Sequence, residues 1–223
     1  MSTITPDAPE QASQQPPKRS WLQTFPNRYL RPAIVLTLIL TIVTGFLYPG
    51  IITGIAQIVF PYQANGSLIK NSSGQVIGSE LIGQYWTAPQ YFHGRPSATL
   101  NTSGTPTPYE ADNSSASNLG PTSATLVKEV KQRTIALKKE NPDAPAGPVP
   151  VDLVTASGSG LDPDISIAAA LYQVPRIASA RGLSQATVIN LINSHETGRF
   201  LGLFGEPYIN VLDLNLALDA QKS

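Results

Sequence analysis

The sequence predicts a single N-terminal transmembrane helix followed by one soluble domain of mixed α/β (α+β) class. Three observations support this prediction. No charged residue lies between Arg31 and Lys70. The apolar run inside that gap is longer than the roughly 20 residues with which a helix crosses the hydrocarbon core of a bilayer. The remaining chain mixes helical and extended patterns, and it is long enough for one core but not comfortably for two.

Residues 1–31 are predicted to be a disordered, basic cytoplasmic tail that ends in a membrane-edge segment. Residues 1–20 are rich in Pro, Gln and Ser and nearly lack large apolar side chains, so they cannot bury enough surface to become ordered. Aromatic and basic side chains follow, and both kinds favour the membrane interface. They are Trp21, Phe25, Arg28, Tyr29 and Arg31.

The distribution of basic residues predicts the topology. Lys18, Arg19, Arg28 and Arg31 precede the apolar run, and the first basic residue beyond it is Lys70. Basic flanks stay in the cytoplasm. We therefore expect a cytoplasmic N-terminus, and we expect residues 61–223 to form an extracytoplasmic domain.

Residues 32–60 form the predicted transmembrane helix and its extension. Pro32 suits the first helical turn, whereas Gly45 and Pro49-Gly50 are expected to weaken or kink the helix. The alternative is a cleaved signal peptide with its cleavage site near Gly54-Ile-Ala56. A secretory apolar region has only about 7–15 residues, so the length favours an uncleaved anchor.

A polar stripe on this helix is a candidate contact with partner helices. Thr37, Thr41 and Thr44 share one face and are followed by Tyr48. Small polar residues in a stripe suit close helix packing in membranes. The alternative is that the threonine hydroxyls bond back to their own helix.

The first half of the soluble domain reads as loops and short strands, followed by a helix. Residues 63–121 are dense in Gly, Ser, Asn, Thr and Pro, which indicates short strands and long loops. Residues 122–140 are amphipathic and predict a helix that starts at Thr122 or Ser123 and stops at Asn141. Residues 151–155 are predicted to be a strand.

The last third reads as helices followed by a strand. Residues 165–173 and 175–180 predict two short helices separated by Pro175, and Gly182 is the expected cap of the second. A further helix is expected from Ser184 to Gly198. Residues 208–218 alternate leucines with Asp213 and Asn215, which predicts a half-buried strand.

Composition and motifs argue against several kinds of active site. A net charge of zero disfavours nucleic-acid binding, and the absence of cysteine excludes thiolate metal sites and a cysteine nucleophile. No Gly-x-Ser-x-Gly motif accompanies His93 or His195, and His195 suits a helix cap or a core position better than a catalytic triad. Asp162 before Pro163 suits a helix N-cap. Residues 157–160 are glycine-rich but lack the lysine of a phosphate-binding loop.

Several strings together resemble the C subunit of the Kdp-type potassium-transporting ATPase. The resemblance runs from the apolar segment to the C-terminus, in the order of the family. Asp164 and the order His195-Glu196-Thr197 depart from the usual pattern. The strings are Tyr91-Phe-His-Gly-Arg-Pro-Ser97, Ser117-Asn-Leu-Gly-Pro-Thr122, Ala156-Ser-Gly-Ser-Gly-Leu-Asp-Pro163, Tyr172-Gln-Val-Pro-Arg176, Gly205-Glu-Pro207 and Asn210-Val-Leu-Asp-Leu-Asn215.

The resemblance implies a non-catalytic accessory subunit with no cofactor of its own, in a complex of the bacterial inner membrane that handles ATP and potassium. The implied partners are an ATP-hydrolysing P-type subunit, a channel-like potassium-conducting subunit and a very small membrane subunit. The family is also described as a catalytic chaperone that raises the ATP affinity of the ATP-hydrolysing subunit. For this chain, the resemblance suggests nucleotide contact at Ser117, Asn118 and Gly120.

Two hypotheses of function follow. With the domain outside the cell, the chain is expected to stabilise the complex and shape external ion access. The alternative is the catalytic chaperone, which needs the domain where ATP is available. The candidate partner contacts in the domain are His93, Arg95, Asn118 and Asp162, and the alternative role for each is loop stabilisation through backbone hydrogen bonds.

Overall fold

The computed structural model describes residues 27–221, with side chains from residue 29 onward. The expected tail, with Lys18, Arg19, Trp21 and Phe25, lies outside the described residues. The described chain falls into two compact units, one ending at Phe60 and one beginning at Pro61. The predicted fold class, one apolar N-terminal helix plus a mixed α/β domain, is confirmed.

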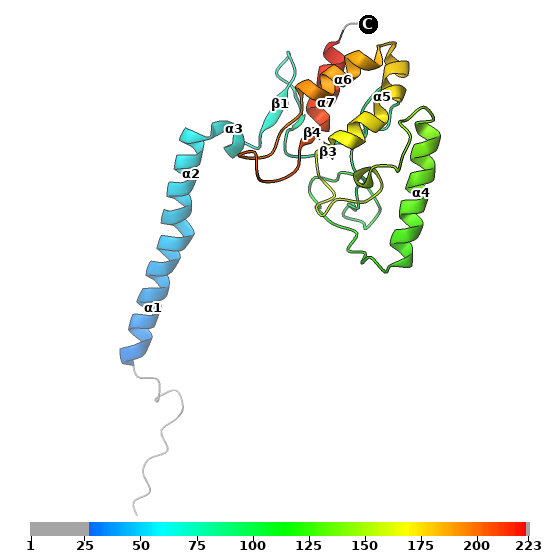
Figure 1. Cartoon of the computed structure of the whole chain (residues 1–223). Coiled ribbons are helices and arrows are strands. Elements are labelled where there is room, and N and C mark those ends of the chain that lie inside the picture. Colours follow the sequence, from blue (N-terminus) through cyan, green and yellow to red (C-terminus); the bar gives the residue numbers. More distant parts are fainter. Residues whose placement is uncertain (1–26, 222–223) are drawn as a thin grey trace, which may run out of the picture. The chain divides into compact units, whose positions relative to one another are not determined.

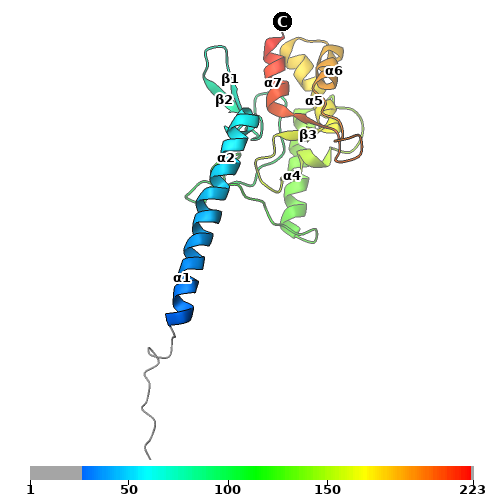
Figure 2. The same ribbon diagram turned by 90° about the vertical axis from the view of Figure 1, so that its left-hand side faces the viewer.

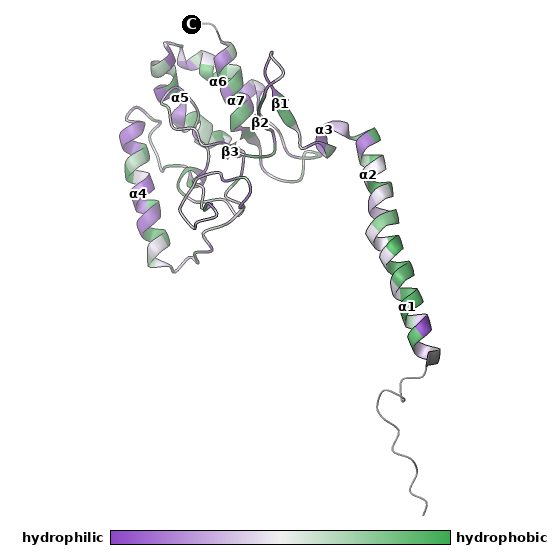
Figure 3. Ribbon diagram, turned by 180° about the vertical axis from the view of Figure 1, so that it is seen from behind, coloured by the Kyte–Doolittle hydropathy of each residue, from purple (hydrophilic) through white to green (hydrophobic). Residues whose placement is uncertain are grey.

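The first unit is one continuous apolar helix (Figure 3). It comprises α1 (Asn27–Ile42), a π-helical segment η2 (Val43–Leu47) and α2 (Tyr48–Val59). Its stretch Tyr29–Val59 has 31 residues and is the one helix of the described chain that is long and apolar enough to cross a membrane. Its large apolar side chains are exposed, as a lipid-facing helix requires.

Two details of this helix differ from the sequence prediction. Pro32 lies inside α1 and not in its first turn, because the helix already begins at Asn27. The expected disturbance at Gly45 and Pro49 takes the form of the widened turn η2, in which the Tyr48 N–H bonds to the Val43 carbonyl. In a regular helix the Pro49 ring would meet the Gly45 carbonyl, so the widened turn lies where that clash would arise.

The second unit combines helices with two small antiparallel sheets, of which the β1–β2 hairpin projects at the edge (Figures 1 and 2). After the short helix α3 (Pro61–Ala64), β1 (Leu68–Lys70) pairs with β2 (Val76–Ser79). Far apart in sequence, β3 (Asp164–Ser166) pairs with β4 (Tyr208–Asn210), with Ile165 opposite Ile209. The predicted short strands and long loops over residues 63–121 are therefore confirmed.

Four longer helices and one short turn complete the unit. They are α4 (Ala124–Glu140), the 3₁₀ turn η3 (Val151–Leu153), α5 (Ile167–Arg181), α6 (Gln185–Ser194) and α7 (Val211–Ala220). Ser123 caps α4 through its side chain, Asn141 ends it, and Gly182 ends α5 in the left-handed conformation, as predicted. The core lies mainly between α5, α6, α7 and the strands β3 and β4. Its fully buried members include Phe92, Ile165, Ile177, Val188, Ile192, Ile209, Leu214 and Leu218.

Three predicted elements are wrong. Residues 151–155 were predicted to be a strand but form η3 (Val151–Leu153) and a turn, and the Asp152 carboxylate accepts a bond from the Ser166 N–H. Pro175 lies within α5 and does not divide it. Residues 208–218 are a strand only up to Asn210, whose side chain then caps α7 by accepting from the Leu212 and Asp213 N–H groups.

The helix after Ser184 also ends earlier than predicted. Ser184 caps α6 as expected, but the helix stops at Ser194 instead of Gly198. His195 is the C-cap residue, and its Nδ1 lies 2.9 Å from the Leu191 carbonyl oxygen. The prediction that His195 serves as a cap is therefore confirmed.

Candidate functional site

Two buried amide side chains hold the segment Tyr91–Ser97 against the core. Asn215 on α7 accepts from the Phe92 N–H (2.8 Å) and donates to the Phe92 carbonyl (3.0 Å). Gln173 on α5 makes the same pair of bonds with His93, at 2.8 and 3.1 Å. Both side chains are 0% exposed. They substitute for a neighbouring strand, because each offers one donor and one acceptor to an extended backbone.

Arg176 on α5 is the buried cation behind this segment. Its guanidinium donates to the carbonyls of Pro89 and Tyr91, to Gln173 Oε1 (2.7 Å) and to Asn141 Oδ1 (3.0 Å). Glu140 lies 3.7 Å from Arg176 Nε and balances its charge. Burial lowers the pKa of Arg176, and Glu140 opposes that shift. A buried charge with this many acceptors orders the backbone around it.

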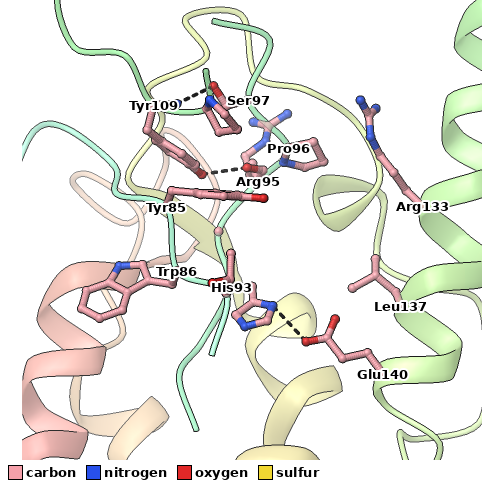
Figure 4. A pocket seen from close by; sticks show the side chains of 13 residues that line it. Tyr85, Trp86, His93, Arg95, Pro96, Ser97, Tyr109, Arg133, Leu137 and Glu140 are labelled. Carbon is pink, nitrogen blue, oxygen red and sulfur yellow. Dashed lines mark hydrogen bonds and ion pairs between the residues drawn. The ribbon is translucent and has the colours of Figure 1, made fainter. Parts of the chain in front are cut away.

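His93 links the same segment to the end of α4. Its Nδ1 lies 3.1 Å from Glu140 Oε1, and its Nε2 lies 3.1 Å from the Ala88 carbonyl oxygen (Figure 4). Burial, with Arg176 as the next cause, lowers the pKa of His93. A neutral imidazole carries one N–H and can satisfy only one of these two oxygens. The neutral ring therefore lies between the end of α4 and the loop at residue 88 and donates a hydrogen bond to one of the two.

Arg95 joins the segment to the glycine-rich string Ala156–Pro163. Arg95 Nη1 lies 2.9 Å from Asp162 Oδ2, and the Tyr109 hydroxyl donates to the Arg95 carbonyl (2.7 Å). The prediction that Asp162 caps a helix is wrong. It precedes β3, and its other carboxylate oxygen accepts from the Asp164 N–H. Burial raises the pKa of Tyr109 far above its usual value and keeps the hydroxyl protonated as a donor.

Gly160 makes this junction possible. Its φ is +69°, and an added Cβ would lie 2.6 Å from the Ser115 carbonyl oxygen and from a methyl of Thr99. The Gly160 carbonyl accepts from the Ser97 hydroxyl at 2.7 Å. Only glycine fits such a position without displacing its neighbours.

A cavity of about 480 Å³ opens between the segment and α4 (Figure 4). His93, Arg95, Arg133 and Glu140 supply its charged lining, and Tyr85, Trp86, Tyr109 and Leu137 are among its apolar and aromatic walls. Each charged group already has a partner inside the chain, including Arg133 with Glu129 at 3.0 Å. Ser97, also in the lining, donates to a carbonyl instead of to a histidine. This arrangement orders loops; it does not form a nucleophile–base pair.

The candidate nucleotide residues lie apart from this cavity. Ser117, Asn118 and Gly120 are exposed, and none of them belongs to its lining. Asn118 has a φ of +52°, and its amide donates to the nearby Ala116 carbonyl. Three of the other five strings contact the segment Tyr91–Ser97, through Asp162, Gln173 and Asn215. The string that contains Asn118 is not one of them.

The candidate contacts on the apolar helix differ in their hydrogen bonding. The Thr44 hydroxyl donates to the Leu40 carbonyl at 2.6 Å, which is the bond to its own helix that the alternative predicted. Thr37, Thr41 and Tyr48 are exposed. A packed partner helix at this stripe remains a prediction.

Sequence reasoning missed the residues that hold the site together. Gln173, Arg176 and Asn215 lie in strings that had been singled out, but no role was assigned to them. Their signal is a polar side chain at a core position of a helix, for instance Asn215 between Leu214 and Leu218. Such a residue needs a buried partner.

A further polar group near Asp162 is the carboxyl group of Asp164, two residues later in the chain. Burial, followed by the charges of Asp162, Asp213 and Glu80, raises the pKa of Asp164 to about 6. Its Oδ1 is buried without a hydrogen-bond partner. Asp164 therefore takes up a proton more readily than an exposed carboxyl does.

Comparison with known proteins agrees with the resemblance. The sequence model of the family described as "K+-transporting ATPase, c chain" matches residues 30–220. The "Potassium-transporting ATPase KdpC subunit" of Rhodopseudomonas palustris (strain BisB18) is 56% identical over 199 residues, which are 86% of this chain and 98% of the relative. The protein of the same name from Sorangium cellulosum (strain So ce56) is 56% identical over 194 residues, which are 87% and 98% of the two chains. The chain belongs to the family of the c chain of the K+-transporting ATPase.

Proposed function

We propose that this chain is a non-catalytic accessory subunit of an ATP-driven potassium uptake pump in the bacterial inner membrane. It stabilises the complex and shapes external access of the ion to the potassium-conducting subunit. The observation that carries the proposal is the family match over residues 30–220 in a chain with one apolar helix of 31 residues. Its partners are an ATP-hydrolysing P-type subunit, a channel-like subunit and a very small membrane subunit.

The orientation follows from charge. Arg28 and Arg31 lie at the start of the helix, and no charged residue follows until Lys70. By the positive-inside rule, this distribution of charge supports a position of the second unit outside the cytoplasm. The ordered loops of the domain suit this role, because the Arg95–Asp162 and Arg176–Glu140 ion pairs and the buried amides of Gln173 and Asn215 hold them in place.

The catalytic-chaperone alternative needs a nucleotide near Ser117–Gly120. That loop has exposed backbone and glycine, which suit a phosphate, but it carries no basic side chain of its own. It also bonds to its own chain through Asn118. These features support the alternative less well than the accessory role.

The test is purification of the full-length chain from its own membranes, with potassium-limited growth measured in parallel. The proposal predicts that a P-type subunit and a channel-like subunit co-purify, and that deletion of the chain abolishes uptake at low external potassium. Arg95→Ala is expected to weaken assembly, with Lys128→Ala as the matched surface control. If the chain purifies alone and uptake survives its deletion, the accessory role is wrong.

A further inference from the structure

The loop between α6 and β4 exposes four large apolar side chains. Phe200, Leu201, Leu203 and Phe204 are 71%, 74%, 75% and 63% exposed. We refer to residues 199–206 as the apolar loop. Single exposed apolar residues are ordinary, but four within five positions form a contiguous patch of the kind that contacts protein or lipid.

The apolar loop has a fixed shape. Phe200 and Phe204 exchange backbone hydrogen bonds of 2.9 and 3.0 Å, and Thr197 pairs with Tyr208 at the base. Leu201 and Gly202 have φ values of +54° and +73°, which form the tight turn at the tip. The loop therefore presents its side chains from a formed hairpin, so little conformational entropy remains to be lost on binding.

The charges of the apolar loop cancel. Arg199 and Glu206 lie at its two ends and form an ion pair with a 2.6 Å contact. No other charged residue lies between them in the sequence. The tip can therefore enter an apolar medium without taking an unpaired charge with it.

The root of the apolar loop connects to the start of the domain. Asn210, two residues after Tyr208, donates to the Glu80 carbonyl at 2.8 Å. The Glu80 carboxylate accepts from the Tyr62 hydroxyl at 3.1 Å. Tyr62 is the second residue of the domain, because Pro61 directly follows Phe60 at the end of the apolar helix.

Apolar surface also lies along this path. Leu81 is 62% exposed and lines one hollow together with Thr197 and Tyr208. Tyr62 itself is 44% exposed. Exposed apolar and aromatic side chains thus lie at both ends of this bonded path, at Tyr62 and Leu81, although Glu80, Asp164 and Asp213 also line the hollow.

We propose that the apolar loop inserts its tip into the interface of the bilayer that anchors the chain. The inference rests on the proposed anchoring by residues 29–59. Lipid is the occupant that the observations favour, because the strand after the loop is linked through Asn210 and Glu80 to Tyr62, which lies two residues beyond the end of the apolar helix. Apolar side chains at the headgroup and acyl boundary gain the free energy of leaving water, and a neutral tip incurs no charge penalty.

The test uses the absence of cysteine from the chain. The full-length Leu203→Cys variant is labelled with a nitroxide and placed in vesicles of phosphatidylethanolamine and phosphatidylglycerol. Collision rates with oxygen and with a water-soluble nickel chelate are compared. Gln132→Cys, at an exposed position of α4, is the matched control. Circular dichroism melting curves check that both variants are folded.

Insertion predicts that oxygen collides with the label at 203 at least several-fold more often than the nickel chelate does, while the label at 132 shows the reverse. A water-like label at 203 in these vesicles would overturn the proposal. So would a label that is water-like in the isolated chain and becomes protected only in the purified complex, since that result assigns the loop to a protein partner. Co-purification of the pump subunits is scored separately, so loss of the accessory role and loss of lipid insertion give different results.

Discussion

The segments Tyr91–Ser97 and Ser117–Gly120 both lack regular secondary structure but have opposite environments. The first has no regular secondary structure, yet Gln173, Arg176 and Asn215 bond its backbone from two helices. The second is largely exposed, and its hydrogen bonds go to near neighbours in the sequence, Ala116 and Ser123. Buried polar side chains can thus make a loop part of the core, whereas a motif of small polar residues alone does not.

The comparison predicts that Arg176→Met has the largest effect. The substitution leaves Glu140 without its buried cation and leaves the carbonyls of Pro89 and Tyr91 unpaired. We expect the free energy of unfolding to fall by about 3–5 kcal/mol. Denaturant unfolding of the full chain in detergent, followed by circular dichroism, measures this change. Arg199→Met is the control, because its ion pair is exposed, and it should change stability by less than about 1 kcal/mol.

Asn215→Ala is expected to have the next largest effect. It removes both partners of Phe92 from a fully buried position, and each unpaired backbone group costs about 1–3 kcal/mol. We expect a total loss of roughly 2–4 kcal/mol in the same unfolding experiment. Asn190→Ala, exposed on α6, serves as the control. If both variants unfold alike, the claim that amide side chains clamp this segment is refuted.

Asp164→Asn tests the carboxyl group of Asp164, which lies two residues after Asp162, the ion-pair partner of Arg95. The folded chain raises the pKa of this group from 3.8 to about 6, so it binds a proton more tightly than the unfolded chain does. The stability of the parent should therefore fall as pH rises from about 4 to 6. Because solvent screens a half-exposed group, we expect the variant to be more stable by only about 1 kcal/mol at pH 7.

The greater stability of Asp164→Asn should vanish below about pH 4, where the carboxyl of the parent is protonated in both the folded and the unfolded chain. Melting temperatures of parent and variant at pH 3.5, 5 and 7 measure it. A difference that is independent of pH would show that the carboxyl charge is not its cause.

Asn118→Gly should have the smallest effect. Glycine adopts the φ of +52° without strain, and the exposed side chain has one local bond to lose. We expect stability to change by less than about 0.5 kcal/mol. A loss of more than 2 kcal/mol in the unfolding experiment would mean that the exposed segment is held as firmly as the clamped one.

The sequence patterns predicted elements whose local signals agree with their packing. Ser123 and Asn141 mark the ends of α4, and Gly182 and Ser184 mark the junction of α5 and α6. In each case a side chain or glycine satisfies backbone groups that the helix end leaves free. The apolar helix was predictable because length and composition alone determine it.

The failures occur where tertiary contacts override local pattern. Leucines at every second position from 212 to 218 suggest a strand, but the buried positions 211, 212, 214, 215 and 218 have helical spacing. The burial of the polar Asn215 concealed that spacing. Pro175 suggested a break in α5, yet buried side chains on both sides of it, including Gln173 and Arg176, hold the helix together. A polar residue at a core position can be recognised from the helix pattern. Its hydrogen-bond partners lie far away in the chain, so no local pattern could show that Gln173 and Asn215 bind the backbone of His93 and Phe92.

The central claim is that the domain from Pro61 onward lies outside the cytoplasm. The most direct measurement is the labelling of Gln132→Cys in intact spheroplasts with a membrane-impermeant maleimide, because this exposed position would carry the only thiol of the chain. We predict full labelling without permeabilisation. Labelling that occurs only after the membrane is opened would contradict the external position of the domain and would favour the nucleotide-handling alternative.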